Sequence, residues 1–339
     1  MDKGLYARIA LASLVTLTAF LSTSCIYIGN HVEMARCEKE VALSAPLQPG
    51  SSFSAVTGDG SIIVKGLDTS ECKVLAKVVT HARTQEAAEE LAQQINVRLE
   101  PSGDGLKVVV DKPSVIRNAN YGVSLDVDLP TKTSLALETS DGAVHITNVT
   151  GTVNAKTSDG SIEVEGLTGD VKLRTSDGGI TCSRIDAKTL NLHTSDGSIR
   201  LTQATLDTGE VQTSDGGITL GEVRSDSLDL RTSDGSIRCR DIVAARVTCH
   251  TSDGGIEVDF SPDTPKALSL SATTSNGSIT FAAPPGLSAT IEANTDDGSV
   301  HTSLPITVQG KVGKSLHGTI GAGEGKIYLK TNDGSITIR

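Results

Sequence analysis

The stretch Leu190-Asn191-Leu192-His193-Thr194-Ser195-Asp196-Gly197-Ser198-Ile199-Arg200-Leu201 decides the fold of this chain. Apolar residues alternate with polar ones on both sides of Asp-Gly, which is the period-2 pattern of half-buried strands. The Asp-Gly pair suits a tight turn, because glycine accepts unusual backbone angles and an aspartate side chain can bond its own backbone. The stretch therefore predicts two short strands joined by a turn.

The same unit recurs along the chain at a fixed period. Its turn aspartates stand 18 or 19 residues apart, at Asp141, Asp159, Asp177, Asp196, Asp215, Asp234 and Asp253. Looser copies follow at Asn276, Asp297 and Asp333, and one early copy is centred on Asp59. Such regularity favours a coil that stacks on itself over an antiparallel meander, since identical residues then lie about 4.8 Å apart in parallel strands. We predict an all-β, parallel β-solenoid with 18–19-residue coils.

The composition agrees with a narrow aliphatic core. Four Phe, four Tyr and no Trp among 339 residues cannot fill a conventional core of this size, whereas 34 Gly suit many tight turns. Alternation places two columns inside the stack: Ile162, Ile180, Ile199, Ile218, Ile237 and Ile256, and Thr157, Thr175, Thr194, Thr213, Thr232 and Thr251. We interpret the Thr column as a buried hydroxyl ladder that bonds between coils, in preference to an ice-binding face.

Five segments are expected in order along the chain. Residues 1–25 form an export signal or anchor, 26–50 a linker, and 51–130 an N-terminal cap with the first strands. Residues 131–302 form the regular repeats, and 303–339 form irregular C-terminal coils and a cap. A helix is expected at about residues 84–97, where Ala88, Leu91, Ala92 and Ile95 share one face.

The N-terminus reads as an export signal. Lys3 and Arg8 precede an apolar run from Ile9 to Phe20, and small residues then lead to Cys25. The run before Cys25 resembles a bacterial lipoprotein signal, although Leu21 stands four residues before the Cys and not the usual three. Simple secretion and an uncleaved anchor from Ile9 to Ile28 stay open. All three place the protein in the cell envelope or outside the cell, with the membrane as partner through a lipid at Cys25 or through the anchor.

The charge excludes one class of partner. The formal net charge is −11, which argues against nucleic acid, whose binders carry a basic footprint. Catalysis also has little support, because the acidic residues are spread evenly along the repeats and no Gly-x-Ser-x-Gly motif occurs in them. No cofactor is indicated beyond the calcium considered next.

One column of acidic residues is a candidate cation site. Glycine- and aspartate-rich solenoids can bind Ca²⁺, but calcium takes six to eight oxygen ligands, and each coil here offers one carboxylate and some hydroxyls. The simpler interpretation is that each aspartate holds its own turn. The residues of this candidate ladder are Asp159, Asp177, Asp196, Asp215, Asp234 and Asp253.

A basic column precedes the Thr column and should point outwards. It could bind an acidic glycan or cell-wall polymer, or simply offset neighbouring carboxylates, which is a small effect at an exposed surface. Its cationic members are Lys156, Arg174, His193, Arg231 and His250.

The other cysteines suggest two disulfides. Cys37 and Cys72 could pair near the entry to the solenoid in an oxidising compartment. Cys239 and Cys249 belong to one coil and should face each other across the core, where a bond needs Cα atoms within about 7 Å. Cys182 lies three coils from Cys239 in the same column and is expected to be a buried thiol.

The order of these features resembles a known family. The early Gly58-Asp59-Gly60-Ser61-Ile62 strand, the helix, the Leu125-Asp126-Val127-Asp128-Leu129-Pro130 strand and the Gly-Ser-Ile coils are similar to the putative-adhesin family of bacterial β-strand-repeat proteins. The resemblance covers roughly residues 50–339 and implies an extracytoplasmic β-solenoid of unknown function, with no site residues to carry over. We expect a non-enzymatic envelope protein for interaction, adhesion or structural support; the alternatives are a calcium-binding module and a glycan-active enzyme.

Overall fold

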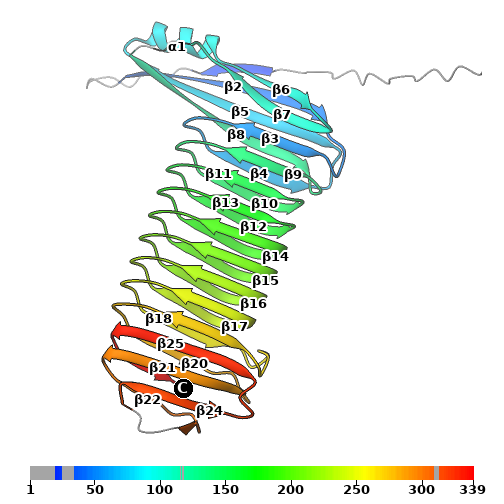
Figure 1. Cartoon of the computed structure of the whole chain (residues 1–339). Helices are drawn as coiled ribbons and strands as arrows, with labels where there is room; N and C mark the ends of the chain where they lie inside the picture. Colours follow the sequence, from blue (N-terminus) through cyan, green and yellow to red (C-terminus); the bar gives the residue numbers. More distant parts are fainter. Residues whose placement is uncertain (1–19, 25–33, 115, 117, 309–312) are drawn as a thin grey trace, which may run out of the picture.

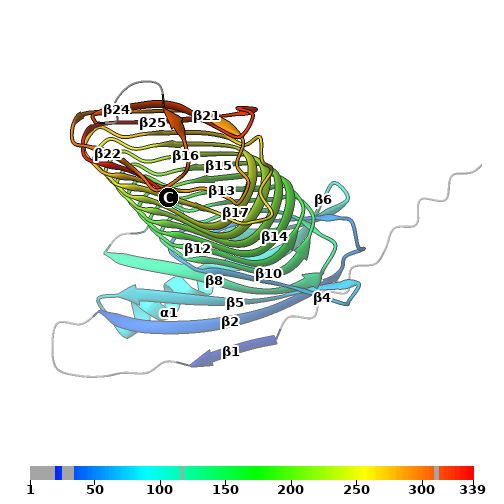
Figure 2. The same ribbon diagram turned by 90° about the horizontal axis from the view of Figure 1, so that it is seen from below.

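The chain forms a stack of β-coils with a cap at each end (Figure 1). The computed structural model describes residues 20–24, 34–114, 116, 118–308 and 313–339. The predicted all-β solenoid is confirmed, because Ile180 pairs in parallel with Ile199, and Ile199 with Ile218, one coil further along the chain each time. Figure 2 looks along the stack and shows the coils lying over one another.

The regular body consists of parallel strands that pair in two continuous ladders, one on each side of the Asp-Gly turn. Its strands are β9 (Ser134–Glu138), β10 (Val144–Thr150), β11 (Val153–Lys156), β12 (Ile162–Thr168), β13 (Val171–Arg174), β14 (Ile180–His193), β15 (Ile199–Gln212), β16 (Ile218–Arg231), β17 (Ile237–His250), β18 (Ile256–Phe260), β19 (Ser269–Thr273) and β20 (Ile279–Ala282). From β14 to β17 each strand runs through a bend and serves both ladders.

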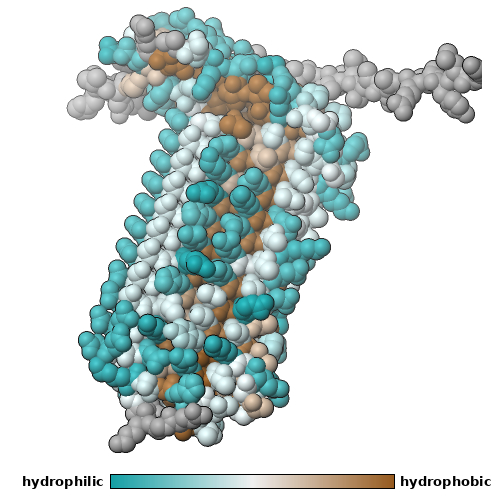
Figure 3. All heavy atoms as spheres, in the orientation of Figure 1, coloured by the Kyte–Doolittle hydropathy of each residue, from teal (hydrophilic) through white to brown (hydrophobic). Residues whose placement is uncertain are grey.

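The core consists of the columns that alternation predicts. The stacked isoleucines are at most 1% exposed and the stacked threonines at most 4% exposed. At about 25 cal/mol per Å² of apolar surface, every coil adds a similar hydrophobic contribution, so stability accumulates along the stack. The rows of hydrophilic and neutral side chains that cover this core run the length of the molecule (Figure 3).

The N-terminal cap begins earlier than the sequence suggested. Residues 26–50 were expected to be a linker, but Ala35–Pro46 form the strand β2, which pairs antiparallel with β5 (Glu71–Ala82). The alternating apolar residues Val41, Leu43 and Ala45 are buried, which explains the strand. The backbone of β1 (Phe20–Ser24) pairs antiparallel with the outer edge of β2. Cys25 and most of the predicted signal lie outside the described residues.

The first coil of the solenoid lies under this cap. β3 (Ser52–Val56) and β4 (Ile62–Leu67), around the early Asp59 copy, stack directly on β9 and β10. On their other side they pair in parallel with β7 (Gly105–Asp111) and β8 (Ala119–Pro130). The antiparallel strands β5 and β6 (Asn96–Ser102) then cover β8 and β7. The segment between residues 71 and 130 therefore closes the N-terminal end.

The predicted helix is present with shorter bounds. α1 spans Gln85–Gln94, and its N-terminus is capped by Thr84, whose hydroxyl accepts the amide of Ala87. Ala88, Leu91 and Ala92 are buried as expected. At the other end, the Lys39 ammonium donates to the carbonyls of Ala92 (3.2 Å) and Ile95 (3.0 Å), which satisfies groups that a helix C-terminus leaves unpaired. Burial lowers the pKa of Lys39.

The C-terminal end corrects the predicted order of the last coils. β21 (Ala289–Asp297) and β22 (Val300–Thr302) were expected to follow the body, with residues 325–339 beyond them. Instead β25 (Gly325–Asp333) lies between β19 and β21, and β26 (Ile336–Ile338) lies between β20 and β22. The antiparallel strand β24 (Ser315–Ile320) covers β21 and pairs with β23 (Thr307–Val308). The last residues of the chain thus form an inner coil (Figure 1).

Candidate functional site

The threonine ladder holds the turns together. The Thr194 hydroxyl donates to the carbonyls of Ser176 (3.0 Å) and Gly178 (2.9 Å) in the preceding coil, and accepts the amide of Gly197 (3.3 Å) in its own turn. Ser176 O also accepts the amides of Ser195 and Asp196, each at 2.9 Å. Equivalent bonds repeat from Thr157 to Thr274, so the predicted buried hydroxyl ladder between coils is present.

The aspartate column plays no such part in its own turns. All of its carboxylates are exposed, and within the described residues no hydrogen bond is found from one of them to its own turn. The interpretation that each aspartate holds its turn is therefore wrong, since the inward-facing threonine does so. In the part of the chain that the structure describes, no group of three or more His, Cys, Asp or Glu side chains could hold a metal ion. Calcium binding by this column stays a prediction.

Much of the basic column is engaged with neighbouring side chains. Lys156 pairs with Glu138 at 2.9 Å, and Arg231 donates twice to Asp229, at 2.9 and 2.8 Å. These contacts are what the charge-offset interpretation predicts.

The two histidines of this column also interact with neighbouring side chains. His250 Nδ1 lies 2.8 Å from the Thr273 hydroxyl. Partial burial, and then the neighbouring Arg174 charge, lower the pKa of His193. Arg174 itself forms no ion pair within the described residues. An anionic partner for the basic column stays a prediction. The ion pairs leave the column less free positive charge with which to bind such a partner.

The register excludes one predicted disulfide. Cys37 lies opposite Thr80 and Cys72 lies opposite Ala45, so along the β2–β5 pair the two cysteines are about 26 Å apart. The prediction of a Cys37–Cys72 disulfide is therefore wrong. The antiparallel register places the two cysteines at opposite ends of the β2–β5 pair, far beyond the about 7 Å that a disulfide allows between Cα atoms. Burial, with the charges of Asp128 and Glu71, raises the pKa of Cys72 to about 12.

The second cysteine pair meets as predicted. Cys239 and Cys249 are both fully buried in one coil, and the Cys239 thiol is within hydrogen-bonding reach of Cys249. This contact and burial raise the pKa of Cys249 well above its ordinary value. The structure holds both as thiols, so their disulfide stays a prediction. Cys182 is a buried thiol whose pKa burial raises to about 12.

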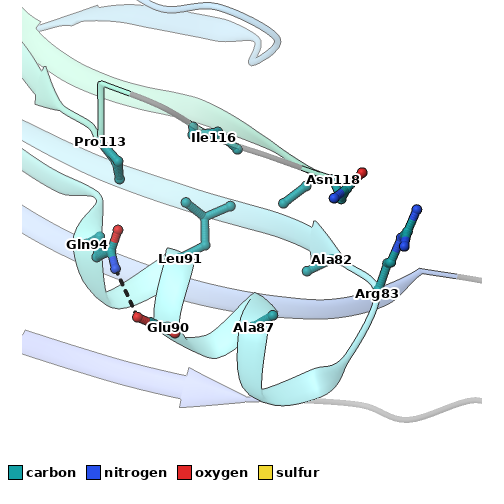
Figure 4. Close-up of a pocket in the computed structure, with 10 residues that line it drawn as sticks. Ala82, Arg83, Ala87, Glu90, Leu91, Gln94, Pro113, Ile116 and Asn118 are labelled. Carbon is teal, nitrogen blue, oxygen red and sulfur yellow. Dashed lines mark hydrogen bonds between the residues drawn. The ribbon is translucent and has the colours of Figure 1, made fainter.

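A hollow of about 320 Å³ lies beside α1 in the cap (Figure 4). Leu91 of the helix faces Pro113 and Ile116 across it, and at its rim Gln94 donates to Glu90 at 3.3 Å. Its lining mixes aliphatic side chains with the polar residues Arg83, Glu90, Gln94 and Asn118. Glu90 and Gln94 bond each other at the rim, so no set of catalytic groups is assembled there.

No described helix is both apolar and long enough to cross a bilayer.

Comparison with known proteins places this architecture. A family model described as Toastrack DUF4097 matches residues 118–184 and 165–339, which together make up well over half of the chain. The chain belongs to the Toastrack DUF4097 family. A search of curated proteins finds no match.

Solved structures that resemble this Toastrack protein are distant in sequence. A putative adhesin from Parabacteroides merdae ATCC 43184 is 13% identical, with 88% of this chain and 96% of that chain covered and a TM-score of 0.45. A putative adhesin from Parabacteroides distasonis ATCC 8503 is 10% identical, with 89% and 97% covered and a TM-score of 0.44. A putative lipid binding protein from the same organism is 15% identical, with 88% and 96% covered and a TM-score of 0.42.

The bend of each coil in this Toastrack protein was missed by sequence reasoning. Arg184, Gln203, Glu222 and Asp241 occupy equivalent positions there and have φ between 52° and 55°, a conformation that favours glycine. Asn148 and Gly166 hold the same place in earlier coils, and because both residue types favour this conformation they were the available signal. A hollow of about 490 Å³ lies along this bend, lined by all four polar residues together with Ala204, Thr205 and Arg224. Its mixed charge favours no single ligand.

Proposed function

We propose that this protein is a non-enzymatic cell-envelope protein that presents a rigid β-solenoid for adhesion or other interactions. The observation that carries the proposal is the unbroken stack of parallel strands from β8 to β22, closed by antiparallel strands at its ends. At about 4.8 Å per strand the stack is about 50 Å long. Its side chains form long regular rows, which suits recognition over an extended surface better than catalysis at one point.

The tether belongs at the cap end. β2 begins at Ala35, ten residues after Cys25, so a lipid on Cys25 would hold the cap within about 35 Å of the membrane. The stack runs away from the cap, and its far end carries β24 (Figure 1). A lipoprotein of this form would extend its C-terminal coils from the membrane surface. Membrane attachment through Cys25 is part of this proposal.

The tether is tested with the full chain expressed in a bacterium. We expect the wild type to incorporate labelled palmitate and to fractionate with membranes. Protease added on the non-cytoplasmic side of that membrane should cut it. Cys25→Ala should lose the label and leave the membrane fraction, whereas Cys182→Ala, which alters a buried cysteine, should keep both. Retention of label by Cys25→Ala would overturn the lipid tether, and a chain that stays in the cytoplasm would overturn the proposed function.

A further inference from the structure

Four consecutive strands carry an unusual set of outward side chains on the sheet that follows the Asp-Gly turn. In a chain with a net charge of −11, these positions hold three arginines and no carboxylate. The positions, on β14 to β17, are Thr181, Ser183, Arg200, Thr202, Thr219, Gly221, Arg238 and Arg240. We call Arg200, Arg238 and Arg240 the arginine surface.

The register places small residues between these arginines. Thr219 on β16 pairs with Arg200 on β15 and with Arg238 on β17. Gly221, the next outward position of β16, pairs with Arg240. The strands on either side of β16 are about 9.6 Å apart, and the two arginines of β17 are about 7 Å apart along their strand. An extended ligand laid over β16 would therefore have guanidinium groups on both sides.

The three arginines are exposed, and no described side chain binds them. Within the described residues none of them forms an ion pair or a side-chain hydrogen bond, whereas Arg184 pairs with Glu165 at 2.5 Å. Carboxylates border this surface without binding it. Asp241 follows Arg240 on β17, Glu222 follows Gly221 on β16, and Glu257 of β18 lies opposite Arg238 in the register and 3.9 Å from Arg339. Because no described side chain holds the three guanidinium groups, they stay available to a ligand laid over β15 to β17.

The spacing selects the kind of ligand. Guanidinium forks match the oxygens of sulfate and phosphate groups, but one such group cannot reach arginines that are about 7–10 Å apart. A polymer with repeated oxyanions can contact all of them, and several weak contacts at exposed sites then combine into useful affinity. The hydroxyls of Thr181, Thr202 and Thr219 lie among the arginines and suit hydrogen bonds to sugars.

We propose that the arginine surface binds a polysaccharide that carries sulfate or phosphate esters. This inference rests on the proposed function, which would expose the side of the stack to such polymers. It also differs from the prediction made from the sequence, which placed an anionic partner on the basic column. That column lies on the other side of the Asp-Gly turn and has two of its five cations bound to carboxylates.

The test uses the full chain in detergent micelles and three probes: dextran sulfate, dextran phosphate and underivatised dextran. We expect binding to one or both esters and none to dextran, with the affinity falling as salt shortens the screening length from about 10 Å at 0.1 M to about 3 Å at 1 M. Binding to only one ester would support the inference and identify the group. Failure of the wild type to bind either ester would overturn it.

Two triple variants separate this surface from net charge. Arg200→Gln/Arg238→Gln/Arg240→Gln should weaken binding at least about tenfold. The matched control Lys156→Gln/Lys172→Gln/Arg174→Gln removes the same charge from the opposite ladder and should weaken it less than about threefold. An equal loss in both variants would overturn the inference. The fractionation and protease assays above are run on the same chain, so a tethered, exposed protein that binds no ester overturns this inference alone.

Discussion

Replacing Thr194 by valine tests whether the hydroxyl ladder, rather than apolar packing alone, stabilises the stack. Valine has nearly the shape of threonine but lacks the hydroxyl. Thr194 is 0% exposed, and Gly178 and Gly197 are half-buried, so water can replace the lost bonds only in part. The carbonyl of Gly178 and the amide of Gly197 would each lose this partner, whereas Ser176 O would keep two amide donors.

The expected loss follows from these bonds. A buried polar group left without a partner costs about 1–3 kcal/mol, so two such groups would cost about 2–6 kcal/mol. Because these two groups are only partly buried, we expect Thr194→Val to be destabilising by about 2–4 kcal/mol. Thr194→Ser keeps the hydroxyl and loses one buried methyl group, which costs about 1 kcal/mol. The valine variant should therefore be the less stable of the two, although it is the more hydrophobic.

Denaturant unfolding of the two variants and the wild type measures the order of stability. Because repeat arrays can unfold in parts, hydrogen exchange at the amide of Gly197 provides a local measurement. We expect faster exchange there in Thr194→Val than in Thr194→Ser. If Thr194→Val were as stable as Thr194→Ser or more so, the ladder would contribute little and the argument from hydrogen bonds would be refuted.

Three further predictions address glycine, pH and calcium. Gly216→Ala should destabilise strongly and Gly217→Ala little, as measured by thermal unfolding, because an added Cβ would lie 2.0 Å from a backbone carbonyl at Gly216 but 3.4 Å from one at Gly217; similar losses would contradict this. The lowered pKa of His193 means that its contribution to stability is complete above about pH 6.5 and is lost as pH falls through the folded-state pKa, so a stability–pH profile should be flatter for His193→Gln. An unchanged profile would show that His193 does not contribute to the pH dependence of stability. Each coil offers one exposed carboxylate where calcium takes six to eight oxygen ligands, so thermal melts in EDTA and in millimolar calcium should coincide; a large upward shift abolished by Asp196→Asn with Asp215→Asn would instead establish an ion site.

The repeat made the fold predictable because each level of the sequence agreed with the next. The 18–19-residue spacing, the alternation around Asp196 and the scarcity of aromatic residues all favoured stacked short strands with an aliphatic core. The inward position of Thr194 followed from alternation alone. The pairing order at the ends could not be deduced in the same way, because any coil of similar pattern can stack on any other. The position of β25 between β19 and β21 depends on tertiary packing that no local pattern records.

The surface chemistry was harder to predict than the core. Aligning the repeats showed which charged residues lie on one face. It did not show which of them form ion pairs with side chains two residues away on the same strand or in the next coil. Arg231 illustrates this limit, because Asp229 on its own strand binds it. The arginine surface was overlooked since its members do not recur in every coil: Arg200 and Arg238 are separated by Thr219. Irregular positions within a regular repeat are therefore where binding specificity is best sought.

The inserted coil has a consequence for the order in which this end of the molecule can form. Synthesis runs from the N-terminus, so residues 325–339 are made after both of the coils that they lie between. The layer between β19 and β21 therefore cannot form until β25 has been made. A chain cut before residue 325 lacks this inner layer and leaves one edge of β19 and one edge of β21 unpaired. Assembly at this end thus depends on the segment that is made last of the three.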